Sequence, residues 1–93
     1  MKESAKAPDA RRLLAVNVQK IRIEMGMSQE KLAEKAGFHR TYVSQVERCA
    51  TNVATDNIQK LADVLGVPVA RLFKLPKSES AKLTQSSPIS PAL

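Results

Sequence analysis

The sequence predicts a small all-α domain, and three observations lead to this prediction. Apolar residues recur at helical spacing, as with Leu14, Val18 and Ile21. The 3 glycines stand where such segments end, and the dipeptides typical of β-hairpins, Asn-Gly and Asp-Gly, are absent. Hydrophobic residues make up 43% of the 93 residues but aromatic ones only 3%, so the core must be mainly aliphatic. A chain of this length suits one domain, and dimerisation would add to its stability.

A first helix is expected to begin near Pro8 and Asp9, where Asp9 can cap it, and to end at Gly26. The spacing predicts a buried face on this helix, made of Leu14, Val18, Ile21 and Met25.

The next segment has the features of a helix that ends in a sharp turn. Ser28 is the expected N-cap, and Glu30 in the first turn favours the positive end of the helix dipole. Gly37 is expected to close the helix with a positive φ, and Phe38 to follow as a core residue. The inner face is predicted to consist of Leu32, Ala33 and Ala36.

A third helix is expected from about Arg40 to Arg48, followed by a loop from Cys49 to Val53. Thr55 is the expected cap of a fourth helix, which ends at Gly66. The inner positions of that helix are predicted to be Ile58, Leu61, Ala62 and Leu65.

Pro68 suits the first turn of a short fifth helix, Val69 to Lys74. Residues 9–75 thus form the predicted domain. Residues 1–8 are short of apolar anchors and are expected to be a flexible arm. Residues 76–93, rich in serine and proline, are expected to be a disordered tail.

The charge and the single cysteine limit the classes of function. The net charge of +6 favours a polyanionic partner, but most of the excess lies in residues 1–12 and 74–93, so the total alone says little. One cysteine, Cys49, cannot form a disulfide within the chain, which fits the cytoplasm. No apolar run could span a membrane, so no membrane partner is expected.

The sequence shows no catalytic constellation. One histidine, His39, and one cysteine are too few for a zinc site of the usual ligand count. Nothing marks a base and an orienting acid near Ser44 that would make it a nucleophile. We therefore expect no enzyme activity, no metal and no cofactor.

The third predicted helix has one polar side that suits the reading of DNA. At 100° per residue, five hydrogen-bonding residues fall within roughly 140°, with Val43 and Val46 on the opposite side. These residue types can bond base edges in the major groove. Any surface helix has a polar side, so the decisive feature is the preceding helix and glycine turn, which together form a helix-turn-helix. The five residues are Arg40, Thr41, Ser44, Gln45 and Arg48.

Residues 16–73 resemble the lambda-repressor-like (Cro/C1-type, XRE) helix-turn-helix family of bacterial and phage regulators. Within it, His39 to Ser44 and the later Asn52 are similar to the controller proteins of restriction–modification systems. The chain departs from the pattern at His39, where a small N-cap residue is usual, and at Cys49, where glycine is usual; a positive φ at Cys49 would cost stability. The residues that carry the resemblance are Arg22, Gly26, Ser28-Gln29, Leu32-Ala33, Gly37, Tyr42-Val43-Ser44 and Val46-Glu47-Arg48.

The resemblance implies a five-helix fold and a cytoplasmic homodimer on a roughly palindromic operator in double-stranded DNA. By position, Gln29 would bond a phosphate and brace the third helix, and Arg22 and Glu47 would pair in the interior. Tyr42 and Asn52 would touch the backbone or the operator centre, and Arg48 could reach either backbone or bases. The base edges would be met by Arg40, Thr41, Ser44 and Gln45.

Two further sets of residues have two interpretations each. The apolar residues near the end of the domain exceed what one small core needs; in the family this region forms the dimer contact, but they could also close the core. The cations near the start could reach phosphate or be free solvated charge. The first set is Val67, Val69, Leu72 and Phe73, and the second is Lys6, Arg11 and Arg12.

These features predict a homodimeric, sequence-specific transcriptional regulator, autoregulatory in the manner of a controller protein. The alternatives are a phage-type repressor, an antitoxin that also binds a protein partner, and an interaction module that has lost DNA reading. RNA polymerase is a further candidate partner. The residues do not encode the operator sequence or the choice between activation and repression.

Overall fold

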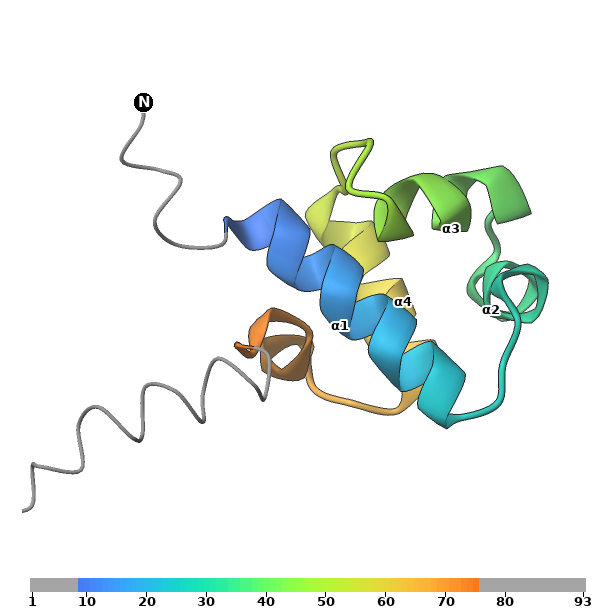
Figure 1. Ribbon diagram of the computed structural model, residues 1–93. Helices are drawn as coiled ribbons and strands as arrows, with labels where there is room; N and C mark the ends of the chain where they lie inside the picture. Colours follow the sequence, from blue (N-terminus) through green and yellow to red (C-terminus); the bar gives the residue numbers. More distant parts are fainter. Residues whose placement is uncertain (1–8, 76–93) are drawn as a thin grey trace, which may run out of the picture.

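The computed structural model describes residues 9–75, and the predicted all-helical class is confirmed for them (Figure 1). The predicted arm, residues 1–8 with Lys6, and the predicted tail, residues 76–93, lie outside the described part. The elements in chain order are α1 (Ala10–Glu24), α2 (Gln29–Ala36), α3 (Arg40–Glu47), α4 (Thr55–Leu65) and the 3₁₀ helix η2 (Val69–Phe73).

The short fifth helix predicted from Val69 to Lys74 is a 3₁₀ helix from Val69 to Phe73 and not a fifth α-helix, because this segment closes i to i+3 hydrogen bonds. The Arg71 amide donates to the Pro68 carbonyl at 2.9 Å, and the segment ends at Lys74, which is extended. The next residue but one is Pro76, which disfavours helical backbone at Leu75. Too few residues remain for a stable α-helical turn to form and continue.

Two of the three predicted N-caps are confirmed. The Asp9 side chain accepts from the Arg12 amide and the Ser28 side chain from the Lys31 amide, each at 2.9 Å. The prediction for Thr55 is wrong: α4 begins one residue earlier, because the Ala54 carbonyl already accepts from the Ile58 amide at 3.0 Å. Ala54 is therefore the N-cap and has no side-chain oxygen to offer.

Each of the four α-helices is followed, within two residues of its end, by a residue with a left-handed backbone. Three of these residues are Gly26, Gly37 and Gly66, with φ of 70°, 80° and 70°, and the fourth is Cys49, with φ of 61°. After α3, the amides of Cys49 and Ala50 return to the carbonyls of Val46 and Gln45 at 3.0 and 2.8 Å. These two hydrogen bonds form the Schellman motif, in which the left-handed residue is usually glycine. The chain thus places a side chain at a position that favours glycine.

We expect Cys49→Gly to stabilise the domain by about 0.5–1 kcal/mol. The left-handed conformation costs a non-glycine residue about 1–2 kcal/mol, and the greater freedom of glycine in the unfolded chain offsets part of the gain. Urea unfolding measures the difference. Cys49→Ala keeps a Cβ and removes the thiol, so it should bring no gain. Equal gains in both variants would refute strain at this residue.

The core lies where the inner faces of the four α-helices and η2 meet. The residues predicted for the inner faces of α1, α2 and α4 are buried, apart from Met25 and the partly buried Ile58. Phe38, predicted as a core residue after α2, is also only partly buried at the edge of the core. The prediction for Met25 is wrong: it is 48% exposed, because α1 ends at Glu24 and the chain turns away before Met25 can face inward. The core residues are Leu14, Val18, Ile21, Leu32, Ala33, Val43, Val46, Leu61, Ala62, Leu65 and Leu72.

One polar side chain in this core, Asn17, fastens η2 to α1. It is 3% exposed, and its amide nitrogen donates to the carbonyls of Leu72 at 3.0 Å and Lys74 at 2.8 Å, besides that of Leu13 in its own helix. Leu72 itself has no exposed surface. The prediction of Leu72 as a dimer contact is therefore wrong, because its side chain closes the core of its own protomer.

Candidate nucleic-acid interface

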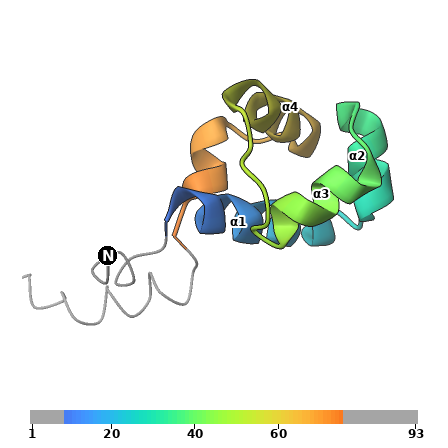
Figure 2. The ribbon, with the colours of Figure 1, turned by 90° about the horizontal axis from the view of Figure 1, so that it is seen from above.

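Helices α2 and α3 are joined by a short turn that contains Gly37, and α3 lies along one edge of the molecule (Figure 1, top; Figure 2 shows that edge from above). Val43 and Val46 are buried, with exposed fractions of 0% and 2%, which fixes the inner side of α3. The opposite side of α3 is left uncovered by the other helices of the described chain. The helix thus offers one continuous surface to a partner.

The five predicted polar residues lie on this uncovered side and do not enter the core. Arg40 begins the helix and is exposed, as is Thr41 beside it. Ser44 and Gln45 are half-buried further along the helix, and Arg48 is exposed at its end. We name this set the α3 surface: Arg40, Thr41, Ser44, Gln45 and Arg48.

The start of α3 lacks one stabilising contact. His39 is the N-cap, with an extended backbone, and its side chain makes no capping hydrogen bond. The departure from the family's small N-cap residue at His39 is thus a real loss, because serine or threonine there would accept from a free amide of the first turn.

A buried network holds α3 against the two preceding helices. The predicted ion pair is confirmed: Arg22 Nε and Nη2 donate to Glu47 at 2.6 and 3.0 Å, and the two side chains are 11% and 1% exposed. Arg22 Nη1 also donates to the Met27 carbonyl at 2.7 Å, in the turn after α1. Gln29 Nε2 donates to Glu47 Oε1 at 2.9 Å, so Gln29 braces α3 as the sequence predicts. Its phosphate contact stays a prediction.

Tyr42 is half-buried beside the uncovered side. Its phenol oxygen accepts from Asn57 Nδ2 at 3.1 Å, and its ring meets Phe38 edge-on with centroids 4.8 Å apart. The phenol proton is still free to be donated. The sequence did not predict the hydrogen bond from Asn57. A polar residue in the first turn of α4 gives no indication of which distant side chain it will contact, and Tyr42 is 15 positions away.

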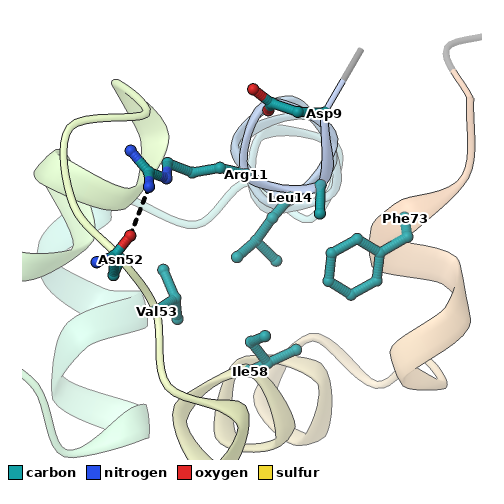
Figure 3. A pocket seen from close by; sticks show the side chains of 8 residues that line it. Asp9, Arg11, Leu14, Asn52, Val53, Ile58 and Phe73 are labelled. Atoms are coloured by element: carbon teal, nitrogen blue, oxygen red, sulfur yellow. Dashed lines mark hydrogen bonds between the residues drawn. The ribbon is translucent and has the colours of Figure 1, made fainter. Parts of the chain in front are cut away.

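Asn52 belongs to the loop between α3 and α4, and this loop lies on the same side of the molecule as α3 (Figure 1). It is exposed, and its Oδ1 accepts from Arg11 Nη2 at 2.5 Å (Figure 3). Arg11 is thus in contact with a predicted site residue and belongs to the first turn of α1. Arg12, the next residue, is exposed.

The described residues contain no group of three or more His, Cys, Asp or Glu side chains placed to hold a metal ion. Among them there is also no helix with the length and apolar character needed to cross a membrane.

A helix-turn-helix family model, HTH_3, matches residues 18–72, which include α2, its turn and α3. The chain belongs to this family. The predicted resemblance is therefore confirmed.

Four similar proteins or solved structures are informative. A hypothetical transcription factor from Neisseria meningitidis is 47% identical over 79 residues, covering 85% of this chain and 74% of that protein. A crystal structure of a hypothetical Neisseria transcription factor matches with a TM-score of 0.71 and 48% identity, covering 81% of this chain and 85% of that one. Control protein C.BamHI from Bacillus amyloliquefaciens is 48% identical over 58 residues, covering 61% of this chain and 72% of that protein.

The fourth match is a crystal structure with DNA. The restriction–modification controller protein C.Esp1396I, as a tetramer in complex with its natural 35 base-pair operator, matches with a TM-score of 0.63 and 33% identity. The match covers 69% of this chain and 84% of that chain. This HTH_3 chain is thus a transcription regulator related to controller proteins, and its relatives are regulators, not enzymes.

Proposed function

We propose that this HTH_3 protein binds a specific operator in double-stranded DNA and that α3 enters the major groove. The observation that carries the proposal is a helix with a buried apolar side, an uncovered polar side, and a buried network that fixes its angle to α2. A recognition helix needs all three features, because a loosely held helix would not keep its side chains in register with base edges.

The residues of the α3 surface differ in what they can do. Arg40, at the start of the helix, can bond both acceptors of a guanine, and Gln45 can pair with an adenine. Thr41 can touch a thymine methyl and Ser44 can donate or accept. Arg48, Gln29 and Tyr42 lie at the margins of this surface and are suited to contact the sugar–phosphate backbone of DNA. Such contacts position the protein but do not specify the base sequence.

We further propose a homodimer on a palindromic operator, with half-sites about 34 Å apart, and control of the protein's own gene. Support comes from the controller C.Esp1396I, whose tetramer was crystallised on its natural operator, and from the identity to C.BamHI.

The dimer contact that we propose consists of Val67, Val69 and Phe73, which are half-buried at the edge of the core. Phe73→Asp is expected to give monomers in sedimentation, because a carboxylate would lose its water at an apolar contact. Val67→Asp is a second, independent test. Either variant, if folded by circular dichroism and still dimeric, would refute this interface.

A salt-series titration against the DNA upstream of the protein's own gene, with scrambled DNA as control, tests the proposed function. Tight binding to the upstream DNA alone, with a steep salt dependence, is the result we expect of an autoregulator. Equal weak binding to both would place the operator elsewhere and refute autoregulation.

A further inference from the structure

Arg11 and Asn52 meet on the surface although 41 positions separate them in the sequence. Arg11 belongs to the first turn of α1, and Asn52 to the loop between α3 and α4. Both line the rim of an open surface cavity whose apolar part comes from Leu14, Val53, Ile58 and Phe73 (Figure 3). The two polar groups therefore lie at the edge of that cavity and not at its centre.

The hydrogen bond between these residues decides which atoms of the amide remain free. An asparagine amide has one oxygen acceptor and two N–H donors, and arginine has donors only. Since Arg11 donates to Oδ1 of Asn52, the amide nitrogen is turned away from the guanidinium, as Figure 3 shows. The pair therefore presents N–H donors together with a positive charge. A ligand that fits it must be an anion with several acceptor oxygens, which is the chemistry of a phosphodiester.

One member of the pair, Asn52, lies close to the C-terminal end of α3 along the chain. Asn52 follows Arg48, the last residue of the α3 surface, by four positions. DNA held along α3 would bring a sugar–phosphate strand beside the groove toward this loop. A backbone contact there would fix the register of α3 without reading any base.

We propose that Arg11 and Asn52 form a clamp for one phosphate of the operator backbone, in which Arg11 orients the Asn52 amide so that its donors face the DNA. This inference rests on the proposed function. It gives α1 a part in DNA binding, and it makes the two residues act as one unit.

The competing account is that the bond is an ordinary surface contact and that Arg11 acts only through its charge. The two accounts differ in whether the effects of losing Arg11 and Asn52 on DNA binding depend on each other. In a clamp, loss of either residue disables the other, whereas free charges contribute independently. Arg12 is a matched control, because it is the next residue, carries the same charge, is exposed, and is not bonded to Asn52.

The test is a titration over a salt series with the duplex that the wild-type chain selects from a random-sequence pool. Arg11→Ala and Asn52→Ala are each expected to weaken binding about tenfold, and Arg11→Ala to reduce the slope of log K against log salt by about one. The double variant should be no weaker than the weaker single variant. Base preference should not change, because no base contact is lost.

Additive losses in the double variant, or equal losses in Arg11→Ala and Arg12→Ala, would overturn the clamp. Arg40→Ala separates this result from a failure of the proposed function. If Arg40→Ala weakens binding and the Arg11 and Asn52 variants do not, only the clamp is wrong. If the wild-type chain selects no sequence, the proposed function and the clamp are both overturned.

Discussion

Glu47→Gln is expected to destabilise the domain by about 3 kcal/mol, because it leaves Arg22 as a buried charge without its partner. Glu47 is the centre of the network: it accepts from Arg22 and from Gln29, and its side chain is 1% exposed. Thermal or urea unfolding measures the loss. In a domain of this size it corresponds to a fall in Tm of roughly 12–24 °C.

The matched control is Glu34→Gln in α2. Glu34 also pairs with a cation, Lys31, but at 3.5 Å and with both side chains more than half exposed. Exposed pairs of this kind contribute less than about 1 kcal/mol. A loss in Glu47→Gln no larger than that in Glu34→Gln would contradict the view that the network holds α3.

Replacing both Arg22 and Glu47 is a second test of whether an unpaired buried charge causes the loss of stability. Arg22→Met combined with Glu47→Leu removes both charges together and is expected to recover at least part of the stability lost in Glu47→Gln. Operator binding should stay weak, because Gln29 would still lack its partner on α3. The double variant would thereby distinguish the effect of the network on the stability of the domain from its effect on the position of α3.

Arg40→Ala is expected to weaken operator binding by about 1–3 kcal/mol and to relax the base requirement at one position of each half-site. Arg40 is the first residue of α3, is exposed, and has the fork geometry that matches the two acceptors of guanine. The measurement is a titration against the operator and against duplexes with single base changes.

Lys20→Ala is the control for charge alone. Lys20 is exposed on α1, so its loss removes the same formal charge from a different helix. It should leave every base requirement unchanged. If Arg40→Ala also left the base requirements unchanged, the assignment of Arg40 to a base edge would be wrong.

The helix ends illustrate what the sequence could predict. Asp9, Ser28 and Gly37 act on their own turns, so their identity and spacing were sufficient. The prediction of Thr55 as N-cap was wrong because Ala54 can begin a helix without a side-chain cap when packing holds the helix in place. The family pattern marked Cys49 only as a position where a positive φ would cost stability, and the structure gives it a φ of 61°.

Contacts between distant residues illustrate what the sequence could not predict. The apolar excess near η2 does not reveal that Leu72 is buried while its neighbours are only half-buried. The bond from Arg11 to Asn52 depends on how α1 meets a loop 41 positions later. Asn17 did carry a signal, since a polar residue falls within the apolar stripe of α1, and such a residue in a core needs a partner.

The central claim is that the α3 surface reads DNA sequence, and a selection from a random-sequence duplex pool tests it most directly. We predict that the wild-type chain enriches an inverted repeat with half-sites one helical turn apart. A variant with Arg40, Thr41, Ser44 and Gln45 all changed to alanine should stay folded, because these side chains lie outside the core, and should enrich nothing. Enrichment of the same repeat by this variant, or of no sequence by the wild-type chain, would contradict the claim.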